Sequence, residues 1–86
     1  MDIGVEISLY PLKSEFVPAI HAFIARLGED SRLRIETNSL STQVFGAYEE
    51  VMEALRRELR ATFDALAAGS DKAVFVMKVL GPLPRG

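Results

Sequence analysis

The stretch "IGVEISLY", residues 3–10, alternates apolar and other side chains and is the starting point for the fold. One face carries Ile3, Val5, Ile7 and Leu9. The opposite face carries Gly4, Glu6, Ser8 and Tyr10. A period of two is typical of a half-buried β-strand. Pro11 follows and is expected to end the strand, because its ring nitrogen cannot donate a hydrogen bond to a neighbouring strand.

Two segments farther along the chain have the spacing of amphipathic helices. The first apolar stripe comprises Phe16, Ile20, Phe23, Ile24 and Leu27. We expect Ser14 to cap this helix, Pro18 to be tolerated near its start, and Gly28 to end it. The second stripe comprises Tyr48, Val51, Met52, Leu55, Leu59, Phe63 and Leu66, and Gly69 follows it. Met52, like Met77, is interpreted as a filler of the core.

Three further segments have the composition of strands. "SRLRIET", residues 31–37, and "STQVFG", residues 41–46, flank a polar bend and predict a β-hairpin. "KAVFVMKVL", residues 72–80, is β-branched and aromatic, and is apolar on both faces except at Lys78. Residues 81–86, "GPLPRG", are expected to form a short Pro/Gly-rich tail. The prediction is therefore one domain over residues 1–80.

The predicted order is β-α-β-β-α-β, which indicates an α+β, ferredoxin-like sandwich. In this topology two helices cover one face of a four-stranded antiparallel sheet, and the last strand lies at an edge beside the first. Val74, Val76 and Leu80 would then lie on the face without helices. An apolar edge strand with a bare face is prone to aggregation unless it is covered, so we expect another subunit to pack there.

Composition narrows the classes of function. A chain of 86 residues that is 49% hydrophobic has more apolar material than so small a domain easily buries, which also favours a homo-oligomer, a dimer or a dimer of dimers. A net charge of −2 gives no basic surface for nucleic acid. The absence of cysteine excludes disulfides and thiolate metal sites. The N-terminus has no signal-peptide pattern and no apolar run spans a membrane, so a cytoplasmic location is expected.

Two polar groups are candidates for a ligand site. Glu6, Ser8 and Tyr10 form a row on the first strand that suits a polar or cationic ligand, although Lys78 of the last strand is placed to neutralise Glu6 instead. The second group surrounds the predicted bend and comprises Thr37, Asn38, Ser41, Thr42 and Gln43. These side chains either bond their own backbone in the turn or line a pocket for a small polar ligand. A turn alone needs Asn38 and one hydroxyl, so the surplus favours the pocket.

Motifs for catalysis are not found. His21 is the single histidine and has no cysteine or second histidine to join it in a metal site. The sequence contains no Gly-rich phosphate loop, no HExxH motif and no nucleophile elbow. The motifs give no support for an enzyme, although acid–base catalysis needs only one carboxylate and a pocket. We expect a binding protein, not an enzyme, with no catalytic residue, resident cofactor or metal.

Three stretches, "GVEISLYPL", "TNSLSTQVFGAYEEVMEAL" and "AVFVMKVL", resemble the small thiamine-binding proteins of the YkoF-like superfamily. The resemblance extends from Ile3 to Leu80. It implies a ferredoxin-like homo-oligomer that binds thiamine or its hydroxymethylpyrimidine part without chemical change. The positions that match the family motifs are Glu6, Ser8, Tyr10, Thr37, Asn38, Ser41, Thr42 and Gln43. In this interpretation the hairpin residues form hydrogen bonds with the pyrimidine, and Glu6 and Tyr10 interact with the thiazolium cation.

Two alternatives share the predicted fold. A dimeric α+β barrel enzyme would need a catalytic histidine or acid facing a deep cavity. An ACT-like regulatory module would bind an amino acid between subunits. A thermal-shift comparison of thiamine, hydroxymethylpyrimidine and amino acids would separate these classes.

Overall fold

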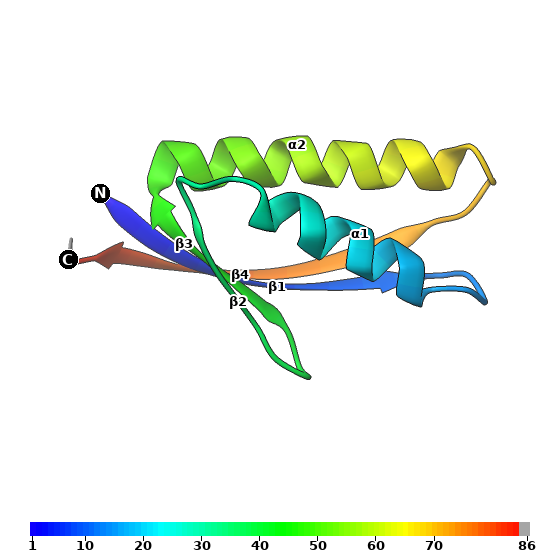
Figure 1. Cartoon of the computed structure of the whole chain (residues 1–86), viewed down its shortest axis with the longest axis horizontal. Coiled ribbons are helices and arrows are strands. Elements are labelled where there is room, and N and C mark those ends of the chain that lie inside the picture. The colour runs from blue at the N-terminus through cyan, green and yellow to red at the C-terminus, as the bar shows by residue number, and fades with distance from the viewer. Residues whose placement is uncertain (85–86) are drawn as a thin grey trace.

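The computed structural model of the chain describes residues 1–84 and forms a two-layer α+β sandwich. Its elements are β1 (Asp2–Pro11), α1 (Val17–Gly28), β2 (Arg34–Thr37), β3 (Thr42–Ala47), α2 (Tyr48–Ala67) and β4 (Ala73–Leu83). All pairings in the sheet are antiparallel and the strand order is β2-β3-β1-β4. Both helices lie on one side of the sheet (Figure 1). The predicted ferredoxin-like fold is confirmed.

The alternation in β1 places the core. Ile3, Val5 and Ile7 are at most 3% exposed and face the helices. They pack with Phe23, Leu27, Val44, Val51 and Leu55. Residues at odd and even positions of a strand point to opposite faces, so Glu6, Ser8 and Tyr10 lie on the face without helices.

The start of α1 differs from the prediction. Phe16, not Ser14, occupies the N-cap, and no side chain there makes a capping hydrogen bond. Pro18 lies in the first turn, where its missing N–H costs nothing because the first N–H groups of a helix have no partner within the helix. The expected cap at Ser14 is wrong because the chain needs residues 12–16 to cross from the end of β1 to the helical layer.

The last strand is longer than expected. β4 runs to Leu83, beyond the boundary at residue 80 that the sequence predicted, and Leu83 pairs with Asp2. Pro82 is compatible with a strand at this position because β4 is the sheet edge, where one side of the strand has no neighbour to receive a donor. Residues 85 and 86 of the predicted tail lie outside the described residues.

Met52 and Met77 do not fill the core as predicted. They are 38% and 42% exposed. On the helix side of β4, Phe75 packs against the rings of Phe23 and Phe63. Farther along this side of the strand, the helices leave Met77 and Val79 exposed. Met77 and Val79 on that strand therefore border an open groove beside Met52 of α2.

A buried ion cluster that the apolar pattern did not predict joins the two helices. Glu58 of α2 is 4% exposed and accepts hydrogen bonds from Arg26 Nε of α1 and from Arg57 Nε at 3.0 Å. Arg26 also donates to Thr62 Oγ1 at 3.1 Å. A buried carboxylate is tolerated only when it is paired and hydrogen-bonded, which these guanidiniums achieve.

Beside this cluster, Asp30 follows α1 and binds Arg32. The Arg32 guanidinium donates to both Asp30 oxygens, at 2.9 and 2.7 Å. This side-chain hydrogen bonding holds the pKa of Asp30 well below its usual range, although burial of the carboxylate opposes the shift. The carboxylate therefore stays charged and fixes the chain as it leaves the helix.

Over residues 1–84, neither helix combines the length and the apolar character that crossing a membrane requires.

Removal of Arg26 should destabilise the fold because it takes one partner from a buried carboxylate. We expect Arg26→Ala to lower the free energy of unfolding by about 2 kcal/mol. Arg60→Ala is the matched control, since Arg60 pairs with Asp64 on α2 with both side chains more than half exposed. This control should change stability by less than about 0.5 kcal/mol. Urea unfolding measures both, and equal losses would contradict a specific role for the buried pair.

Candidate functional site: a pocket at the open end of β1

The site arises where β1 continues past the end of β3. The pairing of β1 with β3 ends at Ile7↔Thr42, whereas its pairing with β4 continues to Pro11↔Ala73. Residues 8–11 of β1 therefore have a neighbouring strand on one side only. The hairpin of β2 and β3 bends away from this flank (Figure 1). Between the flank, the hairpin bend and α1 lies a pocket of about 170 Å³.

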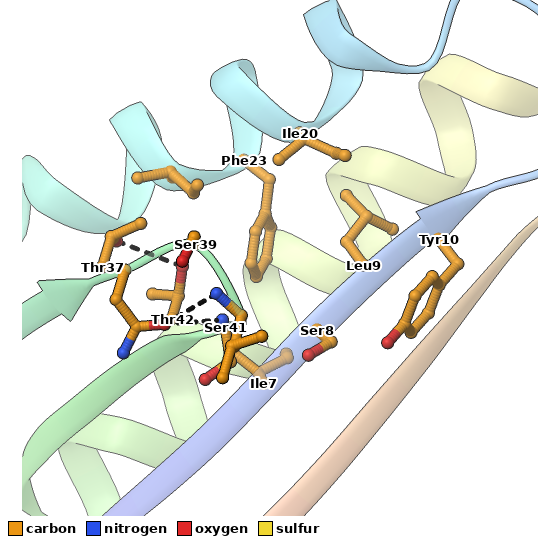
Figure 2. Close-up of a pocket in the computed structure, with 13 residues that line it drawn as sticks. Ile7, Ser8, Leu9, Tyr10, Ile20, Phe23, Thr37, Ser39, Ser41 and Thr42 are labelled. Carbon is orange, nitrogen blue, oxygen red and sulfur yellow. Dashed lines mark hydrogen bonds between the residues drawn. The ribbon is translucent and has the colours of Figure 1, made fainter.

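The pocket has an apolar wall and a polar rim. The apolar members are Ile7, Leu9, Ile20, Phe23, Ile24 and Leu40. The polar members are Ser8, Tyr10, Thr37, Asn38, Ser39, Ser41 and Thr42. Figure 2 shows Phe23 reaching from α1 toward the hairpin, while Ser8 and Tyr10 lie on the other side of β1 from Leu9. Such a combination suits a small heteroaromatic ring whose faces are apolar and whose edges carry donors and acceptors.

Asn38 builds the bend of the hairpin. Its Oδ1 accepts hydrogen bonds from the backbone N–H groups of Leu40 at 2.8 Å and Ser41 at 3.1 Å. Its own N–H donates to the Ser41 carbonyl at 3.0 Å. The turn function that the sequence allowed for Asn38 is thus present, and its side-chain NH₂ is the group that it can offer to a ligand.

Thr37 and Thr42 form a hydroxyl pair at the base of the bend. Their Oγ1 atoms lie 3.1 Å apart, and Thr42 is only 4% exposed (Figure 2). Each hydroxyl can donate or accept, so the pair can match either kind of group on a ligand edge.

The remaining predicted residues lie on the helix-free face. Glu6 and Gln43 are directly opposite each other on β1 and β3, and neither lines the pocket. Ser41 connects the two parts of the site, because it lines the pocket and its hydroxyl donates to Glu6 Oε2 at 3.2 Å. Lys78 Nζ lies 3.8 Å from Glu6 Oε1, so the alternative pairing of Glu6 with Lys78 is present.

Of the eight residues predicted from the sequence, six line the pocket: Ser8, Tyr10, Thr37, Asn38, Ser41 and Thr42. The sequence did not identify the wall formed by Phe23, Ile20 and Ile24, because their helical spacing indicates only that they face inward. It also missed Ser39 and Leu40 at the tip of the bend, although both lie within the polar stretch itself.

In residues 1–84, no group of three or more histidine or acidic side chains is arranged to hold a metal ion.

Solved structures with the same fold come from several organisms. A Streptococcus pneumoniae protein has a TM-score of 0.84 at 16% identity, covering 96% of this chain and 89% of its own. A Thermotoga maritima protein provisionally assigned to thiamine biosynthesis or salvage has a TM-score of 0.79 at 17% identity, covering 92% and 82%. A Methanocaldococcus jannascii protein has a TM-score of 0.78 at 18% identity, covering 99% and 84%. At these identities the likeness shows the fold alone.

No match to a curated protein sequence was found. The model of the YKOF-related family, in contrast, matches residues 2–78, a range that includes all of the residues described as lining the pocket. This match confirms the resemblance that the sequence motifs indicated. The chain belongs to the YKOF-related family.

Proposed function

We propose that this protein binds thiamine or its hydroxymethylpyrimidine moiety, without chemical change, as a homo-oligomer. The observation that carries the proposal is the pocket at the open end of β1, whose wall is apolar and whose rim offers neutral hydroxyl and amide groups. Membership of the YKOF-related family and the provisional assignment of the Thermotoga maritima neighbour support the same class of ligand.

The aminopyrimidine ring matches the chemistry of this pocket. Its faces are apolar and fit against Phe23 and Leu9, and its ring nitrogens and amine need neutral partners such as Ser41 and the hydroxyl pair of Thr37 and Thr42. A buried polar group left without a partner costs about 1–3 kcal/mol, so a lining of this kind selects its ligand sharply.

The volume of the pocket suggests how a two-ring ligand would lie. Sites that enclose drug-sized ligands measure roughly 300–1,000 Å³. A pocket of about 170 Å³ suits one small ring. The pyrimidine would occupy it, and the thiazolium of thiamine would extend past Ser41 to the helix-free face, where Glu6, Gln43 and Tyr10 are placed to contact it.

Binding without catalysis is supported by the chemistry of the lining. Among the 13 described residues that line the pocket, none is an aspartate, glutamate, histidine or lysine. The side chains that most often act as general acids and bases are thus missing from the described lining, in which Tyr10 is the one titratable residue. Chromatography of the ligand after prolonged incubation with the protein should recover it unchanged.

The exposed apolar residues of the helix-free face support the proposed oligomer. Val74, Val76 and Leu80 all belong to the edge strand β4 and are 47%, 49% and 64% exposed. A covering subunit would remove this apolar surface from water and protect the unpaired edge of β4.

The ligand proposal is tested by calorimetry with thiamine and hydroxymethylpyrimidine. We expect Ser8→Ala and Ser41→Ala each to weaken binding about fivefold to tenfold, because each variant removes a rim hydroxyl. Gln43→Ala should weaken it less, since Gln43 lies outside the pocket. Ser14→Ala is the control, an exposed serine in the loop before α1. If neither compound binds the wild-type protein, the proposed function is wrong.

Asn38 separates the structural and ligand functions of the bend. Asn38→Asp retains an oxygen to accept from Leu40 and Ser41 but loses the NH₂ donor. We expect it to keep wild-type stability and to lose ligand affinity. Asn38→Ala loses both, and should reduce the free energy of unfolding by about 1 kcal/mol. Thermal unfolding and calorimetry on the two variants measure this, and full affinity in Asn38→Asp would show that its NH₂ group does not contact the ligand.

Oligomerisation is tested by sedimentation at micromolar concentration. The wild-type protein should form a dimer or tetramer, and Val76→Lys should shift it toward the monomer because a charge in the covered face would have to be desolvated. Val17→Lys serves as the control, since Val17 is similarly exposed, at 47%, but lies on α1. A monomeric wild-type protein would contradict the proposed oligomer and leave the ligand proposal to its own test.

A further inference from the structure

The helix-free face carries a polar row that crosses all four strands. The pairings Glu36↔Gln43, Gln43↔Glu6 and Glu6↔Lys78 place these four side chains side by side, one from each strand. Both carboxylates in the row have a cationic neighbour. Arg34 Nη1 lies 3.0 Å from Glu36 Oε2, and Lys78 Nζ lies 3.8 Å from Glu6 Oε1. The row with Arg34 therefore has no net charge.

Glu6 lies at the exit from the pocket onto this face. Ser41 lines the pocket and donates to Glu6 Oε2 at 3.2 Å. Ser8, another lining residue, is two positions beyond Glu6 on the same face of β1. A ligand group that extends out of the pocket past these two serines meets the Glu6 carboxylate, with the Lys78 ammonium beside it.

The two candidate ligands differ in charge at this exit. Hydroxymethylpyrimidine is a neutral single ring at neutral pH, so the pocket can take it without involving Glu6. Thiamine adds a permanently cationic thiazolium, which is too large to share a pocket of about 170 Å³ with the pyrimidine. That cation would have to compete with Lys78 for the single carboxylate of Glu6 and would be repelled by the ammonium.

We propose that Lys78 is a specificity-determining residue that, by neutralising Glu6, makes the site favour uncharged hydroxymethylpyrimidine over the thiamine cation. This inference rests on the proposed function. It adds which of the two ligands is preferred and which side chain outside the pocket sets the preference.

The size of the effect follows from the exposure of the pair. The Lys78 and Glu6 side chains are 82% and 45% exposed, so solvent screens their interaction. Removal of the ammonium should therefore change the relative affinity for the cation about threefold to fivefold. The effect should shrink at high salt, because screening weakens both the attraction by Glu6 and the repulsion by Lys78.

The experiment measures the affinity of thiamine and of hydroxymethylpyrimidine by calorimetry for the wild-type protein, Lys78→Gln and Lys72→Gln. Lys72→Gln removes the same charge from an exposed residue before β4 that does not line the pocket. We expect the wild type to prefer hydroxymethylpyrimidine. In Lys78→Gln the ratio of thiamine affinity to pyrimidine affinity should rise about threefold to fivefold, and in Lys72→Gln it should stay at the wild-type value.

A second substitution tests the mechanism. Adding Glu6→Gln to Lys78→Gln should abolish the gain for thiamine, because the exposed carboxylate that attracts the cation is then gone. A wild-type preference for thiamine would overturn the inference, and so would a ratio of affinities that does not change in Lys78→Gln. In either case, binding of hydroxymethylpyrimidine would still support the proposed function. If neither compound binds any variant, both proposals are wrong.

Discussion

The mismatch in length between β1 and β3 is the constraint on which the site depends. β1 has 10 residues and β3 has 6, and their pairing ends at Ile7↔Thr42. β4 holds the rest of β1 in an extended conformation as far as Pro11. The end of β1 thus lies beneath α1 with β4 paired to one of its edges and no strand paired to the other. The hairpin bend borders the pocket along this unpaired edge. The difference in strand length creates the pocket, and the particular side chains determine only how it is lined.

The alternation of β1 then decides how the pocket is lined. Ile7 and Leu9 point to the helices and extend the core into the wall, while Ser8 points to the opposite face. A ligand bound over the middle of a sheet could contact side chains of only one of these faces. At an open flank a ligand can contact both, so apolar ring contacts and polar edge contacts come from consecutive residues of one strand.

The strands, the long helix and the order of these elements along the chain were predictable because they follow from local periodicity. Features that depend on distant segments were not. The extension of β4 requires its pairing with Asp2, and the exposure of Met77 depends on where the helices lie above the sheet. Glu58 was not expected to be buried because an acid counts as polar in any periodic pattern, and its partner Arg26 lies on the other helix.

The candidate site was predictable to a similar depth. The hairpin bend has more hydroxyl and amide groups than a turn requires. This surplus correctly indicated that the bend is unusual. Alternation alone separates Thr42 from Gln43, since adjacent strand residues point to opposite faces, and the structure places only Thr42 in the pocket. The contribution of Phe23 could not be inferred, because a residue that faces the core and a residue that lines a pocket at the edge of the core have the same helical spacing.

The neutral row on the helix-free face also bears on the proposed oligomer. Burying a charge without a partner is expensive, whereas a paired and hydrogen-bonded row costs much less. Apolar residues flank the row on both sides, with Val76 toward one end of the sheet and Phe45 and Leu80 toward the other. A second copy could cover those flanks while water or ligand remained between the rows. The pairing of Lys78 with Glu6 would then serve both functions of the face, because it removes net charge from a surface to be covered and from the exit of the pocket.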